Sequence, residues 1–399
     1  METTAAVAGL DCLDCGETHA VDTATHRCPA CGGILDAQYE LEAVGLARED
    51  LAQRPFESMW RYAELLPFTP SSAVSMEEGA TPLVEGPSLA EGLGVDRVLI
   101  KDEGRNPTGT FKDRGQTVAV TAAVGHGASE IALASAGNAG HSAAAYAARA
   151  GLAAHVFLPE RAGYTQKAMV EVHGGDLTVV EGGITGAGAA FETASKSNPD
   201  WYPTATFVTP YRHEGKKTMG YEILEQLEFE PPDAIVYPTG GGVGLVGVHK
   251  AARQFQELGL VDDLPPLYAV QSTGCAPIVE AWESGSPIHQ TWSAPDSICA
   301  GIEIPDPGAS PLIIEALEES DGGAVAVPDE QILSAAIDVA RKEGVEVGAT
   351  PAAAAAGAQA LAERGEFDTD DTVVLLSTGA GIKDVDLLRS HAGAAGGDD

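Results

Sequence analysis

The 399-residue sequence predicts an α/β protein with parallel sheets, two domains and a small cysteine-bearing module near the N-terminus. From Asp96 onward, short β-branched runs alternate with amphipathic or alanine-rich segments, which is the pattern of repeated strand–helix–strand units. The chain is long enough for two domains with real cores, and 44% of its residues are hydrophobic. Four closely spaced cysteines precede this pattern and indicate the additional module.

The predicted elements follow the chain in order. Region 41–66 is expected to be rich in helix, and the alanine-rich run 351–362 is an ordinary helix because alanine has the highest helix propensity. Helices are expected between most of the strands. The glycine-rich and aspartate-rich tail 391–399 is expected to be disordered. The strand candidates are 97–101, 130–135, 154–158, 177–181, 205–208, 234–237, 267–271 and 372–376.

The charge of the chain excludes several classes of partner. There are 59 acidic against 23 basic residues, and the net charge of −36 repels both nucleic acid and anionic membranes. No apolar run reaches the ~18–20 residues of a membrane span, and residues 1–10 lack the basic start of a signal peptide. We therefore expect a cytoplasmic protein without nucleic-acid or membrane partners. The acidic, lysine-poor composition is similar to that of halophilic proteins, whose charges are screened in high salt.

Four cysteines, Cys12, Cys15, Cys28 and Cys31, form the spacing C-x2-C-x12-C-x2-C. Two such pairs can converge on one tetrahedral Zn²⁺, and the alternative is a pair of disulfides. The cytoplasmic expectation favours a structural zinc ribbon over 8–35. A catalytic zinc is not expected, because four thiolates leave no open coordination position. Cys275 and Cys299 are isolated and are expected to be packed in the core.

The run K-D-E-G-R-N-P-T-G-T-F-K-D-R-G at 101–115 lies between a strand-like segment and a helix pattern at 116–124. Lys112 therefore falls near the start of that helix. The positive end of the helix dipole and the charge of Arg114 favour a neutral amine there. A neutral lysine amine is what Schiff-base chemistry requires. The alternative is a surface loop with a solvated lysine.

Two further loops lie between a strand and a helix. The run S-A-G-N-A-G-H-S at 135–142 directs backbone N–H groups toward a bound carboxylate, although a simple turn and helix cap has the same pattern. The run T-G-G-G-V-G at 239–244 lets the backbone curl around a phosphate at a helix N-terminus. It is not a nucleotide P-loop, because the required G-K-[ST] ending is absent. It is not a dinucleotide-binding fingerprint either, because there is no G-x-G-x-x-G register with an acidic residue at the expected offset.

The string P-T-G-T-F-K-D-R-G resembles the lysine motif of fold type II pyridoxal-phosphate (PLP) enzymes, which include threonine synthase, threonine dehydratase and the tryptophan synthase β subunit. The strings E-G-A-T-P-L at 78–83 and T-G-A-G-I-K-D at 378–384 are similar to those of the threonine synthase family. The zinc ribbon and Trp60-Arg61-Tyr62 resemble the archaeal type. The resemblance implies two doubly wound α/β domains with the cofactor in the cleft between them, plus the ribbon.

The resemblance also implies roles for individual residues. Lys112 would carry PLP and act as the catalytic base, and Asn138 would contact the 3′ oxygen of the cofactor. Ser135 and the following amides would hold the substrate carboxylate, with Ala139 in a position where many relatives have Thr. Thr378 would contact the pyridine nitrogen, which suits elimination and replacement chemistry; the alternative is a strand-ending turn. The cofactor phosphate would lie against Gly240, Gly241, Gly242, Val243 and Gly244.

The run T-P-Y-R-H-E-G-K-K-T at 209–218 resembles the family string N-P-Y-R-x-E-G-x-K-T, whose arginine contacts the substrate phosphate. Arg212 takes that place, and a guanidinium matches a phosphate well; the alternative is a surface salt bridge. The implied reaction converts O-phospho-L-homoserine and water to L-threonine and phosphate, in a homodimer. Its small-molecule partner is thus a phosphorylated amino acid.

Three departures from the family pattern concern the substrate and leave the cofactor unaffected. Ala139 replaces Thr, Thr206 stands where Asn is common, and Glu303 falls where Arg is expected. A carboxylate near a phosphorylated substrate is repulsive unless it points away or pairs with Arg212. Threonine or serine dehydratases and cysteate-synthase-like β-replacement enzymes therefore remain alternatives. A non-catalytic zinc-ribbon scaffold is an alternative of another class, supported by the ribbon alone.

The predicted domain division follows from the loops. The ribbon spans 8–35, and a larger PLP-binding domain comprises 36–115 and 205–390 with the phosphate loop and Thr378. A smaller domain, 116–204, carries the asparagine loop, and the tail is 391–399.

Overall fold

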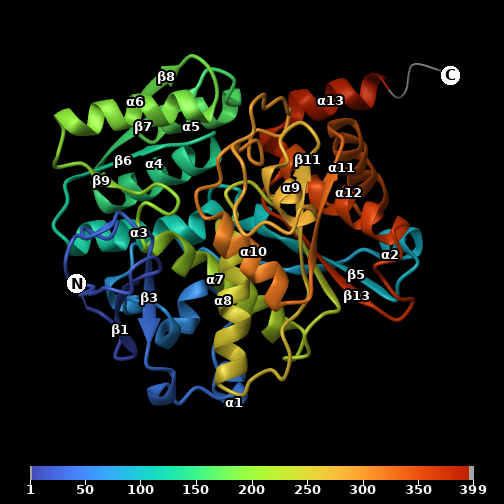
Figure 1. Ribbon diagram of the computed structural model, residues 1–399, viewed down its shortest axis with the longest axis horizontal. Helices are drawn as coiled ribbons and strands as arrows, with labels where there is room; N and C mark the ends of the chain where they lie inside the picture. Colours follow the sequence, from blue (N-terminus) through green and yellow to red (C-terminus); the bar gives the residue numbers. More distant parts are fainter. Residues whose placement is uncertain (1, 395–399) are drawn as a thin grey trace. The chain divides into compact units, whose positions relative to one another are not determined.

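The computed structural model describes residues 2–394, which divide into two compact units (Figure 1). Unit 1 contains the chain up to Ala80 together with Phe111–Tyr221 and Arg253–Asp262. Unit 2 contains Thr81–Thr110, Glu222–Ala252 and the chain from Asp263 onward.

The main sheet of unit 1 has four parallel strands in the order β8-β7-β6-β9. The strand order reverses after β8, so a right-handed connection places α6 on the opposite face of this sheet from α4 and α5 (Figure 1). The elements are β6 (Glu130–Ala134), α4 (Asn138–Ala150), β7 (Ala153–Pro159), α5 (Tyr164–Val172), β8 (Asp176–Val180), α6 (Ile184–Ser197) and β9 (Tyr202–Pro203).

Unit 1 also holds a three-stranded antiparallel sheet with the order β2-β1-β3, which we call the ribbon sheet. Short helical turns follow it. Two longer helices, α3 and α7, complete the unit, and α7 continues into unit 2 from Glu222 onward. The elements are β1 (Val7–Cys12), β2 (Thr18–His19), β3 (Leu35–Tyr39), η1 (Leu41–Ala43), α1 (Arg48–Ala52), η2 (Met59–Leu65), η3 (Pro70–Ser72), α3 (Lys112–Gly125) and α7 (Tyr211–Gln226).

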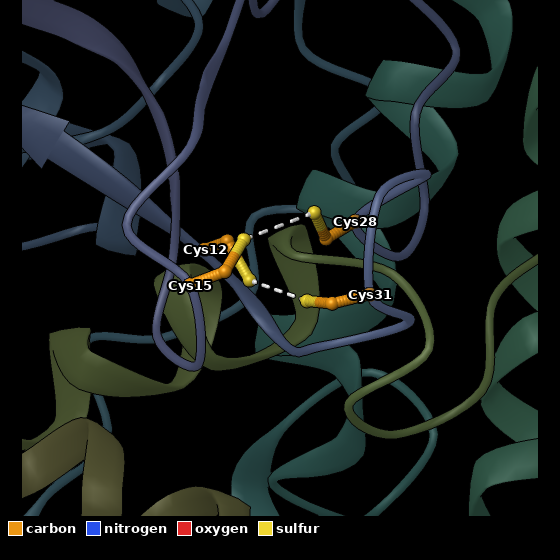
Figure 2. A group of neighbouring side chains, drawn as sticks. All are labelled: Cys12, Cys15, Cys28 and Cys31. Carbon is orange, nitrogen blue, oxygen red and sulfur yellow. Dashed lines mark hydrogen bonds between the residues drawn. The ribbon is translucent and has the colours of Figure 1, made fainter.

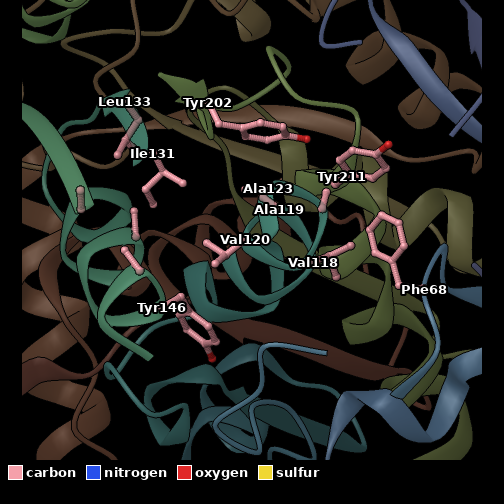
Figure 3. Packing of buried hydrophobic residues seen from close by; sticks show 14 of the residues in the cluster. Phe68, Val118, Ala119, Val120, Ala123, Ile131, Leu133, Tyr146, Tyr202 and Tyr211 are labelled. Atoms are coloured by element: carbon pink, nitrogen blue, oxygen red, sulfur yellow. The ribbon is translucent and has the colours of Figure 1, made fainter. Parts of the chain in front are cut away.

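One hydrophobic core joins the parts of unit 1 (Figure 3). Leu10 and Ala37 from the ribbon sheet belong to the same buried cluster as Phe68, Val118 of α3 and Ile131 of β6. Such a continuous core is what makes a set of elements one compact unit. The ribbon sheet therefore packs as part of unit 1.

The sheet of unit 2 has the order β12-β11-β10-β13-β5-β4, with five parallel strands and β4 antiparallel at one edge. The alanine-rich α12 is buried against this sheet because its small side chains allow close approach. The strands are β4 (Leu83–Glu85), β5 (Arg97–Asp102), β10 (Ala234–Pro238), β11 (Leu267–Ser272), β12 (Gly323–Val327) and β13 (Thr372–Ser377). The helices are α2 (Pro87–Leu93), η4 (Glu103–Arg105), α8 (Val243–Glu257), α9 (Pro277–Glu283), α10 (Ser310–Glu319), α11 (Asp329–Glu343), α12 (Ala349–Glu363), η5 (Gly381–Lys383) and α13 (Val385–Ala394).

The predicted α/β architecture is confirmed, and seven of the eight predicted strands are present within about a residue of their predicted bounds. The strand predicted at 205–208 is wrong. Residues 206–208 form a turn with Phe207 at φ 54°, and the strand that joins the sheet is β9, which pairs with Ile131 and Ala132. β12 and the edge strand β4 were not predicted. Among the described residues no helix is long and apolar enough to cross a membrane.

The two units divide the chain differently from the predicted domains. Residues 36–80 and Lys112 group with the asparagine loop, because Met59, Trp60 and Phe68 share the core of α3 and α4. The disordered tail was predicted to begin at residue 391, but residues 391–394 are helical. α13 continues to Ala394, and His391 is hydrogen-bonded to Ser334 of α11 at 3.1 Å. The remainder of that prediction, 395–399, lies outside the described residues.

Candidate active site and cysteine cluster

The four cysteines of the predicted ribbon come together in unit 1 (Figure 2). Their sulfur atoms all lie within 4.8 Å of one another; Cys12 and Cys31 are separated by 3.4 Å, and Cys15 and Cys28 by 3.6 Å. None of the four forms a disulfide. Four convergent thiols are the donor set of a structural zinc site, so the residues present fit Zn²⁺. The isolated Cys275 and Cys299 are fully buried, as predicted.

Lys112 is the first residue of α3, as the sequence predicted. Burial and, second, the positive charge of Arg212 lower the pKa of Lys112 from 10.5 to about 7. A substantial fraction of the amine is therefore neutral at pH 7. The neighbouring charge was predicted to be Arg114, and that part of the prediction is wrong. The Arg114 guanidinium instead donates a hydrogen bond to Thr218 of α7 at 3.0 Å.

The residues after Lys112 fasten the start of α3 to two other helices. Asp113 is fully buried and accepts a hydrogen bond of 2.5 Å from the hydroxyl of Ser142, which belongs to α4 directly behind the asparagine loop. Gly115 leaves room for Arg212, because a Cβ at this position would lie 2.8 Å from the Arg212 carbonyl oxygen and 2.9 Å from its Nε. The D-R-G part of the motif thus fixes the position of Lys112 relative to α4 and α7.

The asparagine loop joins β6 to α4 in the same unit. The Ser135 hydroxyl accepts hydrogen bonds from the backbone N–H groups of Gly137 and Gly140, both at 3.0 Å, and thereby fixes the turn. Gly137 has a φ of 150°, which a residue with a side chain rarely adopts. Asn138 begins α4 with its side chain beside Gln166, whose Nε2 lies 3.4 Å from Asn138 Oδ1. Ala139 is half-buried, and its carbonyl accepts a hydrogen bond from Gln116 of α3.

Arg212 lies in the first turn of α7 and is 0% exposed, so the surface salt bridge considered from the sequence is excluded. Its Nη1 donates to the carbonyl oxygen of Thr204 at 2.7 Å. Its Nε and Nη2 are buried and have no hydrogen-bond partner among residues 2–394. Burial lowers the pKa of Arg212 to about 10, so the group still carries its charge at neutral pH. A buried cation with two unused donors requires an anion.

The glycine loop lies in unit 2 between β10 and the N-terminus of the fifteen-residue α8. Gly242 has a φ of 69°, and a Cβ on Gly240 would lie 2.6 Å from the carbonyl oxygen of Gly301. Glycine is therefore required at both positions. The first N–H groups of α8 have no acceptor within the helix, and together with the helix dipole they suit a phosphate.

The T-G-A-G-I-K-D string follows β13 in unit 2. Thr378 is buried, and its carbonyl accepts a hydrogen bond from Thr110 at 3.0 Å. Asp384 accepts a hydrogen bond of 2.9 Å from the backbone N–H of Ala349, the first residue of α12. The aspartate of the string is thus a helix cap supplied from another element. The neighbouring Ser377 hydroxyl is buried and has no partner among the described residues, which the sequence did not indicate.

The structure also places the departures from the family pattern. Glu303 is 1% exposed, and its Oε2 accepts a hydrogen bond of 3.0 Å from the backbone N–H of Ser297, so one carboxylate oxygen is used within its own segment. Thr206 lies in the turn that precedes α7 and is half-buried. Three ionisable residues that follow Arg212, namely His213, Glu214 and Lys217, were not singled out from the sequence although they are also buried.

These residues fit PLP by the chemistry of their donors. Lys112 supplies an amine with a pKa lowered to about 7. The glycine loop supplies backbone N–H groups at the start of α8, where a side chain at Gly240 or Gly242 would clash with neighbouring protein atoms. A comparison with known protein families also indicates a PLP enzyme. The family model described as "Pyridoxal-phosphate dependent enzyme" matches residues 74–379.

Curated proteins that are similar to this chain belong to one group of these enzymes, the threonine synthases. A threonine synthase of Methanosarcina acetivorans is 37% identical over 94% of this chain and 92% of its own length. A threonine synthase of Methanocaldococcus jannaschii is 36% identical over 94% of this chain and 93% of its own length. One of Mycobacterium tuberculosis is 37% identical over 78% of this chain and 84% of its own length.

Solved structures of other proteins are similar to this chain in fold, and this similarity is evidence for the fold only. Threonine deaminase isoform 2 of Solanum lycopersicum is similar with a TM-score of 0.67 at 24% identity, over 79% of this chain and 88% of its own. Diaminopropionate ammonia lyase of Escherichia coli is similar with a TM-score of 0.70 at 17% identity, over 86% of this chain and 94% of its own. The chain belongs to the pyridoxal-phosphate-dependent enzyme family and, within it, to the threonine synthases. It is thus a PLP-dependent lyase, and the non-catalytic scaffold considered from the sequence is set aside.

Proposed function

We propose that the protein converts O-phospho-L-homoserine and water to L-threonine and phosphate. The observation that carries this proposal is Arg212, a fully buried guanidinium whose Nε and Nη2 have no partner among residues 2–394. Dehydratase substrates such as threonine and serine bring no phosphate to such a group. A phosphate ester would satisfy both donors in a bidentate arrangement.

Each of the remaining site residues has a role in this proposal. Lys112 would hold the cofactor covalently. Asn138 would contact the 3′ oxygen of the cofactor, and Thr378 would contact its ring nitrogen. Ser135 and the loop amides after it, including that of Ala139, hold the substrate carboxylate. The cofactor phosphate would be held by Gly240, Gly241, Gly242, Val243 and Gly244. When bound, PLP supplies an electron sink for negative charge that develops beside the substrate amine.

The chain's own groups account for the proton and phosphate movements. When PLP is bound, the amine of Lys112 would be released by the substrate amine and would remove the Cα proton; a pKa near 7 suits this base to neutral pH. Arg212 binds the γ-phosphate and stabilises its charge as the Cγ–O bond breaks. Breaking this bond requires that one Cβ proton is also removed. The oxygen of water then bonds to Cβ while its second proton leaves with the phosphate, and one proton is placed at Cγ and one is returned to Cα.

The test is phosphate release from O-phospho-L-homoserine by the purified holoenzyme in high salt, with identification of the amino-acid product. Threonine and phosphate in equal amounts support the proposal. A protein that binds PLP normally but releases no phosphate contradicts it. The next substrates would then be threonine, serine and O-phosphoserine, because the departures at Ala139, Thr206 and Glu303 all concern the substrate.

Three further properties belong to this proposal. We propose that Cys12, Cys15, Cys28 and Cys31 bind one structural Zn²⁺, supported by their convergence in unit 1. We propose a cytoplasmic homodimer, supported by the resemblance to threonine synthases. We propose adaptation to high salt, supported by the net charge of −36.

A further inference from the structure

The ribbon sheet and the loop that follows β2 contact α7 on both sides of Arg212. The carboxylate of Asp36 in β3 accepts a hydrogen bond of 2.7 Å from Nε2 of His213. The hydroxyl of Tyr39, also in β3, donates a hydrogen bond of 2.5 Å to Glu214. On the other side of Arg212, the hydroxyl of Tyr211 donates to the carbonyl oxygen of Val21 at 3.2 Å. Residues on both sides of Arg212 in the chain are thus held by the N-terminal segment that carries the cysteine cluster.

The α7 side of these contacts is buried. His213 is 2% exposed and Glu214 is 0% exposed. Lys217, one turn further along α7, forms a buried ion pair of 2.6 Å with Glu214, and its ammonium lies 4.0 Å from the centre of the Tyr39 ring. Burial and the charge of Glu214 raise the pKa of Tyr39 well above its usual value, so the hydroxyl remains a donor. Each of these hydrogen bonds is therefore costly to lose.

The cluster of Asp36, His213 and Glu214 also has the residue types of a metal site. The ammonium of Lys217 at 2.6 Å from Glu214 argues against this use, because a divalent cation would be repelled by the lysine. The cluster is better explained as a set of hydrogen bonds that fix α7 against β3.

Among residues 2–394, one hydrogen-bond partner holds the Arg212 side chain. Nη1 donates to the carbonyl oxygen of Thr204, whereas Nε and Nη2 have no partner among the described residues. The direction of these two donors therefore depends on where the backbone of α7 lies. Binding energy from a bidentate contact requires that this geometry exist before the anion arrives.

We propose that Asp36 and Tyr39 are positioning residues, through which the ribbon sheet holds the first turn of α7 so that Arg212 meets the substrate phosphate. This inference rests on the proposed role of Arg212 as the phosphate-binding group. It assigns the cysteine-bearing module a part in substrate affinity in addition to stability. Neither Asp36 nor Tyr39 touches the substrate in this scheme.

The test uses the PLP-loaded full-length protein and four variants. Asp36→Ala and Tyr39→Phe remove one link each, and Asp36→Asn keeps an acceptor for His213. Thr18→Val is the matched control, because it removes a 2.6 Å hydrogen bond to Asp11 inside the ribbon sheet. Three quantities are measured for each variant: the KM and the kcat for O-phospho-L-homoserine, and the dissociation constant of inorganic phosphate by calorimetry. Retention of the PLP absorbance and of the unfolding temperature shows that a variant is folded.

We expect Asp36→Ala and Tyr39→Phe to raise both KM and the phosphate dissociation constant by roughly three- to tenfold, with kcat changed less than twofold. Asp36→Asn should recover most of the loss, and Thr18→Val should behave as the unsubstituted protein. Folded variants with unchanged phosphate affinity, or an equal loss in Thr18→Val, would overturn the inference.

The phosphate measurement separates this inference from the proposed function. If the unsubstituted protein binds phosphate through Arg212, shown by loss of binding in Arg212→Lys, but does not turn over O-phospho-L-homoserine, only the substrate assignment fails. If Arg212→Lys binds phosphate as tightly as the unsubstituted protein, the role of Arg212 fails and the inference fails with it.

Discussion

Gly215 of α7 lies directly against the carbonyl oxygen of Arg114 in α3. A Cβ at Gly215 would occupy the position of that oxygen and would lie 3.0 Å from Cα of Gly115. The two helices therefore cross where each carries a glycine, one from the lysine motif and one from the arginine motif. This crossing holds Lys112 and Arg212 in the same part of unit 1, and the charge of Arg212 consequently lowers the pKa of Lys112.

Because the helices are so close at this crossing, one added methyl group at Gly215 should strongly destabilise the protein. Gly215→Ala should lower the free energy of unfolding by about 2–4 kcal/mol, because the added carbon overlaps backbone atoms that cannot move aside. Gly188→Ala in α6 is the control, since a Cβ there meets nothing within 4 Å. The control should raise the free energy of unfolding by about 0.5–1 kcal/mol. Denaturant titration of both variants in the same high-salt buffer measures the difference; equal effects would show that the helices can separate.

Much of the fold and several site residues could be predicted from the sequence because local pattern and motif agree there. The strand before the lysine motif, the turn and the helix after it are all encoded within about twenty residues. Lys112 therefore falls at the start of α3 as expected. Cys12, Cys15, Cys28 and Cys31 converge for the same reason, since each pair occupies one short turn.

The contacts made between distant segments could not be predicted. The sequence suggested Arg114 as the cation beside Lys112, because Arg114 is two residues away, but Arg212 has that effect and is a hundred residues further on. Asp36 and His213 are separated by 177 residues, and no local pattern relates them. Phe207 lies in a run with strand propensity, yet its φ of 54° turns the chain toward α7. Tertiary packing decided each of these cases.

Lys112→Ala should abolish both covalent attachment of PLP and turnover, because alanine has no amine to form the bond. The measurement is the visible absorbance of the purified protein after gel filtration, together with phosphate release. Lys342→Ala is the control, since it removes the same charge from an exposed pair with Asp338. A persistent protein-bound absorbance band in Lys112→Ala would show that PLP is carried elsewhere.

The low pKa of Lys112 predicts how PLP attachment depends on pH. Only the neutral amine reacts, and a pKa lowered to about 7 means that the neutral form increases as the pH rises through 7. The initial rate of covalent PLP attachment to the PLP-depleted protein should therefore rise with pH and reach half its maximum near pH 7. An ordinary lysine, with a pKa of about 10.4, would give a midpoint about three pH units higher. A midpoint near pH 10 would mean that Lys112 is not desolvated before PLP binds.

Metal analysis tests the cysteine cluster. The protein purified without chelator should contain about one Zn²⁺ per chain, and Cys15→Ser should lose most of it because one thiolate of four is removed. Cys275→Ala should retain the metal, since Cys275 lies outside the cluster. Removal of the metal should also lower the unfolding temperature, because the ribbon sheet shares the core of unit 1. A metal content near zero in the unsubstituted protein, with disulfides detected by thiol titration, would favour the alternative pairing of the cysteines.

The net charge predicts an unusual response to salt. With 59 acidic and 23 basic residues, repulsion between like charges opposes the folded state at low ionic strength. Raising KCl shortens the screening length from about 10 Å at 0.1 M to about 3 Å at 1 M, so the unfolding temperature should rise steeply over this range. A titration with sucrose at matched osmolality is the control, since sucrose favours the compact state without screening charge. An unfolding temperature that rises equally in sucrose would assign the effect to solvent exclusion, whereas a larger rise in KCl assigns it to the acidic surface.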